Sequence, residues 1–198
     1  MRTLLLPLLV SFSLAIGSQP SGSAGAIADV AAQDTAPQAA VAAFPASWSG
    51  TWKGEVTPFS PRGAGEPFTM TLAIAATDDP ARFTWTITYE GAAGTQVRPY
   101  HLLVRDSARG AFAIDEGGGV VLEGRFLGGV WYTWFEIGGT RLLVREELQA
   151  AGTPEASISF EIVTASAAAS AAGSAPAGAP VSVPPAASQR ACLRRVAP

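Results

Sequence analysis

The sequence predicts an all-β fold: an antiparallel meander of about nine short strands, closed into an up-and-down barrel. Two observations predict it. Apolar and polar residues alternate in one segment after another between residues 44 and 165, and short turns rich in glycine, proline or aspartate separate these segments. Strands joined by tight turns pair as antiparallel neighbours, and this many strands must protect their edges. A closed barrel is therefore expected, with a two-sheet β-sandwich as the alternative.

The first expected strand, residues 48–56, shows the alternation clearly. Two tryptophans, two glycines and a valine occupy one face, and serine, threonine, lysine and glutamate occupy the other. In the next two strands, residues 68–74 and 83–89, threonines alternate with large apolar side chains, and β-branched threonine suits a pleated strand. Further strands are expected at residues 100–104, 111–114, 120–126, 130–137, 141–148 and 157–163.

The chain ends flank this domain with segments of a different composition. Residues 1–28 have the layout of a signal peptide, because Arg2 precedes an apolar run and then small residues that allow cleavage after Gly17 or after Ala28. The run is shorter than the about 20 residues of a membrane span. We therefore expect a secreted or periplasmic protein with no stable membrane span after cleavage. Residues 29–43 and 166–198 are rich in Ala, Ser, Gly and Pro, which predicts a disordered linker and a disordered tail around the domain at 44–165.

Composition argues against several classes of partner and cofactor. The formal net charge is −3 and Lys53 is the one lysine, so a surface that follows nucleic-acid phosphates is not expected. His101 is the one histidine, which leaves little material for a zinc site, and no cofactor is expected. Cys192 is the one cysteine, so it cannot form a disulfide within the chain. In an oxidising compartment Cys192 can instead link two tails into a dimer.

No pattern of catalytic residues stands out, so an enzyme is not expected. A nucleophile elbow of the form G-x-S-x-G is absent, and any Ser-His-Asp arrangement would have to recruit His101. The glycines at residues 117–119 lie between two expected strands and so predict a hairpin tip. The acidic pairs at residues 115–116 and 146–147 are adjacent on strands, so each pair points to opposite faces and cannot act together as an acid and a base.

Strand alternation also places a few polar residues on inward faces. Arg98 falls with Tyr100 and Leu102, Thr133 falls between two aromatic residues, and Glu146 falls between two aliphatic ones. A charge inside a barrel must be paired or reach water. Arg98 and Glu146 can pair with each other, or one or both can lie at the mouth of the barrel.

Tyr89 and Trp85 fall on the inward face by the same counting. A phenol on an apolar wall offers a ligand one directional hydrogen bond, and it also makes an ordinary core residue. His101 falls on the opposite face, with the residues expected to meet solvent.

The tripeptide Gly50-Thr51-Trp52 resembles the G-x-W motif that opens the first strand of the lipocalin and fatty-acid-binding group. The resemblance implies a barrel that carries a ligand, with Gly50 and Trp52 as structural residues. It also implies that Trp52 closes the barrel floor beneath an arginine from a late strand, a role for Arg141 or Arg145. The T-D-Y element of lipocalins has no counterpart here, and the helix that follows their last strand has none either. The alternative is that Trp52 is simply a large core residue.

Two functional hypotheses follow. The first is an exported, non-enzymatic barrel that binds a small apolar or amphipathic ligand, with fatty or aromatic acids as first candidates. The second is an envelope module with a filled core that binds another protein. A cavity of several hundred cubic ångströms would favour the first hypothesis. The residues expected to bind the ligand are Arg98, Tyr100, Glu146, Tyr89 and Trp85.

Overall fold

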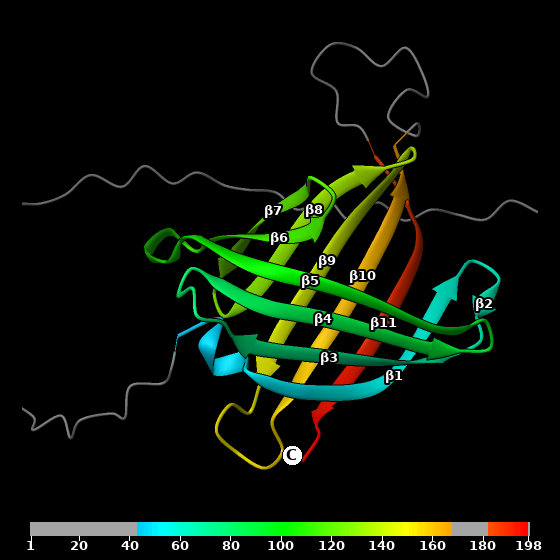
Figure 1. Cartoon of the computed structure of the whole chain (residues 1–198). Helices are drawn as coiled ribbons and strands as arrows, with labels where there is room; N and C mark the ends of the chain where they lie inside the picture. The colour runs from blue at the N-terminus through cyan, green and yellow to red at the C-terminus, as the bar shows by residue number, and fades with distance from the viewer. Residues whose placement is uncertain (1–42, 168–181, 198) are drawn as a thin grey trace, which may run out of the picture. The chain divides into compact units, whose positions relative to one another are not determined.

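The computed structural model describes residues 43–167 and 182–197 of the chain, and this part is a closed antiparallel barrel of 10 strands (Figure 1). Each strand of the ring pairs with its neighbours in the sequence, and pairing between β11 and β1 closes the ring. The predicted all-β up-and-down barrel is therefore confirmed, and the sandwich alternative was wrong. The strands are β1 (Gly50–Ser60), β2 (Gly63–Ala64), β3 (Phe68–Ala76), β4 (Arg82–Gly91), β5 (Gly94–Asp106), β6 (Ala111–Gly117), β7 (Val120–Leu127), β8 (Val130–Ile137), β9 (Thr140–Gln149), β10 (Ser157–Ser166) and β11 (Pro185–Arg195).

All nine predicted strands are present, with changes at some of their ends. β1 begins at Gly50, because Trp48 belongs to the 3₁₀ turn η1 (Ala46–Trp48) that precedes it. β5 begins at Gly94 and not near residue 100, so the β4–β5 hairpin is longer than predicted. β2 is a two-residue strand that pairs with the end of β1 outside the ring. A second 3₁₀ turn, η2 (Ser107–Arg109), follows β5.

The predicted domain boundary at residue 165 was wrong, because β11 belongs to the barrel. β11 pairs with β10 on one side and with β1 on the other, where Trp52 lies opposite Arg195. Leu193 is the one large apolar side chain that β11 buries. The other residues of this strand include three alanines and three arginines, so its alternation is too weak to be seen in the sequence. The predicted signal peptide, the linker up to residue 42 and residues 168–181 of the predicted tail lie outside the described residues.

Cys192 also lies on β11, where its side chain is exposed. The predicted dimer depended on a flexible tail, and this part of the predicted tail is a barrel strand. A disulfide between two chains would therefore have to bring two barrel walls together. The link through Cys192 stays a prediction.

Trp52 is a core residue at the seam between β1 and β11. Its side chain is 0% exposed, and its indole Nε1 donates a hydrogen bond to the Trp48 carbonyl oxygen at 2.9 Å. The guanidinium carbon of Arg195 lies 4.3 Å from the centre of the Trp52 ring, which is cation–π geometry. Arg195 also donates to the Ser49 carbonyl oxygen at 3.0 Å. The buried tryptophan thus ties the start of the barrel to its last strand.

The arginine above Trp52 is therefore Arg195, and the choice of Arg141 or Arg145 was wrong. Arg141 pairs with Glu136, and Arg145 pairs with Glu147.

The same seam explains why residue 50 is a glycine. Its φ of +133° is in a region that side chains rarely adopt, and a Cβ there would lie 2.6 Å from the Arg195 guanidinium. A glycine at this position therefore leaves room for the arginine.

An aromatic cluster fills the barrel near η1. The Phe44 ring stacks on the Phe126 ring with centroids 4.3 Å apart, and it meets the Phe112 ring edge-on at 4.8 Å. Phe44 also contacts Trp85 and Trp131, with ring centroids 6.5 and 5.8 Å away. This cluster closes one region of the interior and leaves space beyond the two tryptophans.

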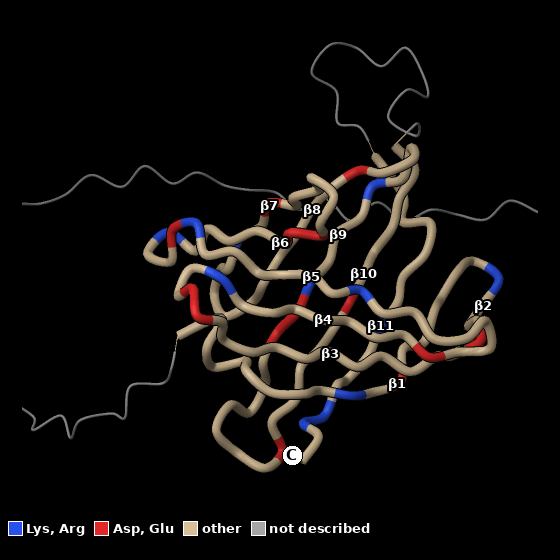
Figure 2. Tube along the Cα trace, viewed as in Figure 1, with Lys and Arg blue, Asp and Glu red and all other residues tan. Residues whose placement is uncertain are grey.

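Charges of both signs lie mixed along the strands and turns (Figure 2). The ion pairs of residues 43–167 and 182–197 all involve at least partly exposed side chains, so each contributes little stability. In these two ranges no helix is long and apolar enough to cross a membrane.

A candidate ligand cavity inside the barrel

The barrel contains a cavity of about 940 Å³ that opens to solvent and to which strands β3 to β11 all contribute side chains. This volume lies within the range of small-molecule sites. The walls are mainly apolar, and their floor includes Trp85 and Trp131 of the aromatic cluster. The interior is thus not the filled core that the protein-binding hypothesis expected.

All five residues predicted to bind a ligand line this cavity, as strand alternation indicated: Arg98, Tyr100, Glu146, Tyr89 and Trp85. Thr133 lines it too. Their presence in the wall is a structural finding, and their contact with a ligand remains a prediction. No cluster of three or more metal-ligating side chains occurs in the part of the chain that the structure describes.

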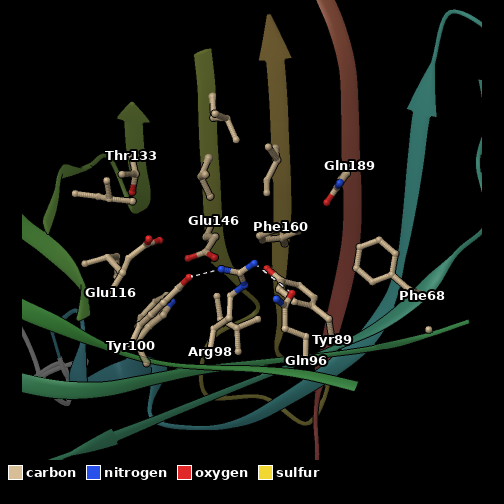
Figure 3. Close-up of a pocket in the computed structure, with 18 of the residues that line it drawn as sticks. Phe68, Tyr89, Gln96, Arg98, Tyr100, Glu116, Thr133, Glu146, Phe160 and Gln189 are labelled. Carbon is tan, nitrogen blue, oxygen red and sulfur yellow. Dashed lines mark hydrogen bonds between the residues drawn. The ribbon is translucent and has the colours of Figure 1, made fainter. Parts of the chain in front are cut away.

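Arg98 reaches into the cavity from β5 and binds neutral partners (Figure 3). One guanidinium nitrogen donates to the Tyr100 hydroxyl at 2.9 Å, and another donates to the Gln96 side-chain oxygen at 3.2 Å. The hydrogen bond with Tyr100 raises the pKa of Arg98, so the side chain remains charged. Among the described residues no carboxylate comes within ion-pair distance of Arg98. The pairing of Arg98 with Glu146 is therefore not formed.

Glu146 lies on the opposite wall, on β9, where its register partners are Trp131 and Phe160. The residue is 3% exposed, and its Oε2 atom is buried without a hydrogen-bond partner. Burial raises the pKa of Glu146 from 4.5 to about 8, because the charged form loses its hydration. At pH 7 the side chain is therefore mostly a neutral carboxylic acid, and Arg98 carries its charge without an opposite charge bound to it.

Tyr89 supplies a second phenol beside Tyr100. Burial, and then the nearby Glu146, raise the pKa of Tyr89 to about 12, so it stays a neutral hydroxyl. Its ring meets the Phe68 ring edge-on with centroids 5.7 Å apart. Both phenols combine an apolar ring with a hydroxyl, a character suited to an amphipathic ligand.

Sequence reasoning missed several polar residues of the cavity wall, among them Gln96, Glu116 and Gln189. Gln189 lay in the predicted tail, and Gln96 lay before the predicted start of its strand. Glu116 was considered only with Asp115, and the structure agrees that these two face opposite ways: Asp115 pairs with Arg82 at 3.4 Å while Glu116 lines the cavity. The alternation of β6 could have identified Glu116 as inward.

Glu146→Gln is expected to remove a pH-dependent cost of folding. Since the folded-state pKa is about 8 and the ordinary value is 4.5, the folded protein keeps a proton that the unfolded chain releases. Glu146 therefore costs the folded protein no stability through ionisation below pH 4.5, where both states hold the proton. The cost grows as the pH rises to about 8. Because glutamine does not ionise, the variant should gain on the wild type across this window by a few kcal/mol at most, then level off. Urea unfolding across the window measures this.

Glu147→Gln is the matched control for that experiment, because Glu147 is the next residue but pairs with Arg145 on the outer face. Its stability difference from the wild type should not rise across the same pH window. A flat Glu146→Gln profile would show that the carboxyl is ionised or hydrated in the folded protein.

Comparisons with known proteins support the barrel fold. No protein-family model matches the sequence, and no curated protein does either. An S-type phycobiliprotein lyase from Guillardia theta aligns with a TM-score of 0.50 and 10% identity, over 77% of this chain and 90% of the lyase. A protein of unknown function from the DUF3598 family, from Nostoc punctiforme, aligns with a TM-score of 0.49 and 13% identity over 76% of this chain. The alignment covers 48% of that protein, so the chain spans about half its length.

At these identities the likeness concerns the fold alone. The chain is a closed antiparallel barrel, in agreement with the barrel that the G-x-W resemblance implied, and no family is shown.

Proposed function

We propose that the protein is an exported, non-enzymatic barrel that holds a small amphipathic acid, with the carboxylate on Arg98 and the apolar part against the cavity walls. The observation that carries the proposal is the charged Arg98 side chain, without a carboxylate partner, in a largely apolar cavity of about 940 Å³. Export is supported by the signal-like sequence of residues 1–28.

The hydrogen bonding of Arg98 favours an acid over a neutral ligand. A guanidinium has five N–H donors, and Arg98 uses two of them on the neutral groups of Tyr100 and Gln96. A carboxylate can accept two of the remaining donors at once, which gives the contact a fixed geometry as well as charge assistance. The apolar walls suit an alkyl chain or an aromatic ring. Fatty and aromatic acids are therefore the ligand class that the cavity supports best.

Arg98→Met is expected to weaken binding of dodecanoate by about tenfold or more, because charge-assisted hydrogen bonds contribute roughly 1.5–3 kcal/mol. Methionine keeps much of the apolar stem while removing the charge. Binding of dodecanol, which has the same chain and no carboxylate, should change much less. Quenching of tryptophan fluorescence can follow both titrations, since Trp85 and Trp131 line the cavity.

Arg105→Met is the matched control, because Arg105 lies on the same strand but pairs with Glu123 on the outside of the barrel. This variant should bind dodecanoate as the wild type does. If neither dodecanoate nor a panel of aromatic acids binds the wild-type protein, or if Arg98→Met leaves every acid titration unchanged, the proposed function is wrong.

A further inference from the structure

The buried carboxyl of Glu146 has no role in the fold or in the binding of a simple fatty acid. Its Oε2 atom has no hydrogen-bond partner, and neither of its strand neighbours on the cavity wall, Trp131 and Phe160, donates a hydrogen bond to it. Leaving a buried polar atom unpaired costs free energy, so native structures rarely retain one without a partner that binds there. An apolar residue at this position would pack between two aromatic rings at no such cost.

The carboxyl faces the ligand cavity. Glu146 lines the cavity although it is 3% exposed, and the surrounding wall is made of aliphatic and aromatic side chains such as Val144 and Ile162. Thr133, which is 4% exposed and lies opposite Val144 on β8, adds a hydroxyl to the same wall. Glu146 and Thr133 together form a small polar spot in an apolar surface, across the barrel from β5 (Figure 3).

Within residues 43–167 and 182–197, no charged group forms a hydrogen bond with Oε2 of Glu146. Arg98 donates to Tyr100 and Gln96 and makes no ion pair with Glu146. The other ionisable side chains that line the cavity are Tyr89, Tyr100, Glu66 and Glu116, and none of them donates a hydrogen bond to Oε2 of Glu146. A partner for Glu146 can therefore come from a ligand in the cavity that it lines.

We infer that the ligand is a hydroxylated acid, whose carboxylate binds Arg98 and whose hydroxyl binds Glu146. This inference rests on the proposed function and specifies its ligand class. A hydroxyl suits Glu146 because it can both donate and accept, and so pairs with the carboxyl whichever oxygen holds the proton. Since burial keeps the carboxyl mostly neutral at pH 7, an uncharged hydroxyl fits better than an ammonium group.

The test is a series of monohydroxy-dodecanoates in which the hydroxyl moves along the chain, titrated beside dodecanoate itself. At least one isomer is expected to bind the wild-type protein about fivefold or more tightly than dodecanoate, because a hydrogen bond to a buried unpaired group recovers roughly 1 kcal/mol or more. Glu146→Leu should bind that isomer and dodecanoate equally well. Glu146→Gln should keep part of the preference, since its amide also donates and accepts.

A second readout is the infrared C=O band of the Glu146 carboxylic acid, identified by its loss in Glu146→Gln. The preferred isomer should shift this band and dodecanoate should not. The inference is overturned if no isomer binds more tightly than dodecanoate, or if the preference survives in Glu146→Leu. In both cases dodecanoate binding that depends on Arg98 would leave the proposed function intact. Failure of every acid to bind would overturn both.

Discussion

A chain that ends at Ala167 is expected to lose cooperative folding. The truncation removes β11, whose Leu193 is fully buried and whose backbone pairs with both β1 and β10. Loss of one large buried aliphatic side chain costs roughly 2–5 kcal/mol, and the loss of two strand pairings adds to it. The total is comparable with the stability of about 5–15 kcal/mol of a typical domain. Urea unfolding followed by tryptophan fluorescence should show no sharp transition.

A loop variant separates loss of the strand from loss of the connection. Residues 168–181 can be replaced by a short Gly-Ser linker, because Ala165 on β10 already lies opposite Pro185 on β11. This variant should unfold cooperatively at nearly the wild-type midpoint. Cooperative unfolding of the truncated chain at that same midpoint would mean that β11 does not close the barrel.

Trp52→Ala is expected to destabilise the domain by roughly 3–5 kcal/mol, as truncation of a buried large aromatic side chain does. The substitution removes the surface on which Arg195 stacks and the hydrogen bond to the Trp48 carbonyl. It also leaves a cavity where the side chain was 0% exposed. The shift of the urea midpoint at constant slope measures the effect.

Trp134→Ala is the control, because Trp134 is 69% exposed on the outer face of β8. It should change stability by about 0.5 kcal/mol or less, as surface substitutions usually do. Equal effects of the two substitutions would mean that Trp52 is not a core residue and that its contact with Arg195 does not stabilise the seam.

The sequence predicted the fold well wherever one face of a strand is buried and the other is wet. β3 and β4 have large apolar side chains at every second position, so both their existence and their inward faces could be read. β11 could not be found in this way, because Leu193 is its one large buried apolar residue and arginines follow it directly. A strand that is held by backbone pairing on both sides needs little apolar periodicity of its own.

For the candidate site, the sequence predicted which side chains face the interior but not which of them contact one another. Alternation gives the side of the sheet on which a residue lies, so Arg98, Tyr100 and Glu146 were correctly placed inside. It gives no distance across a barrel, and the expected Arg98–Glu146 pair failed for that reason. Arg98 instead binds Tyr100 and Gln96, each two residues away on its own strand. The late-strand arginine was missed because Arg195 belongs to β11.

The seam between β1 and β11 also affects how the protein can fold. The hydrogen bond from Arg195 to the Ser49 carbonyl joins residues 146 positions apart, so the contact that completes the ring has one of the longest chain separations in the domain. Long closures have a high entropic cost and slow folding. Hairpins such as β3–β4 can form while the chain is being synthesised, but the ring cannot close until residue 195 is available. Until then β1 and β10 present open edges, at which pairing with other chains competes with closure.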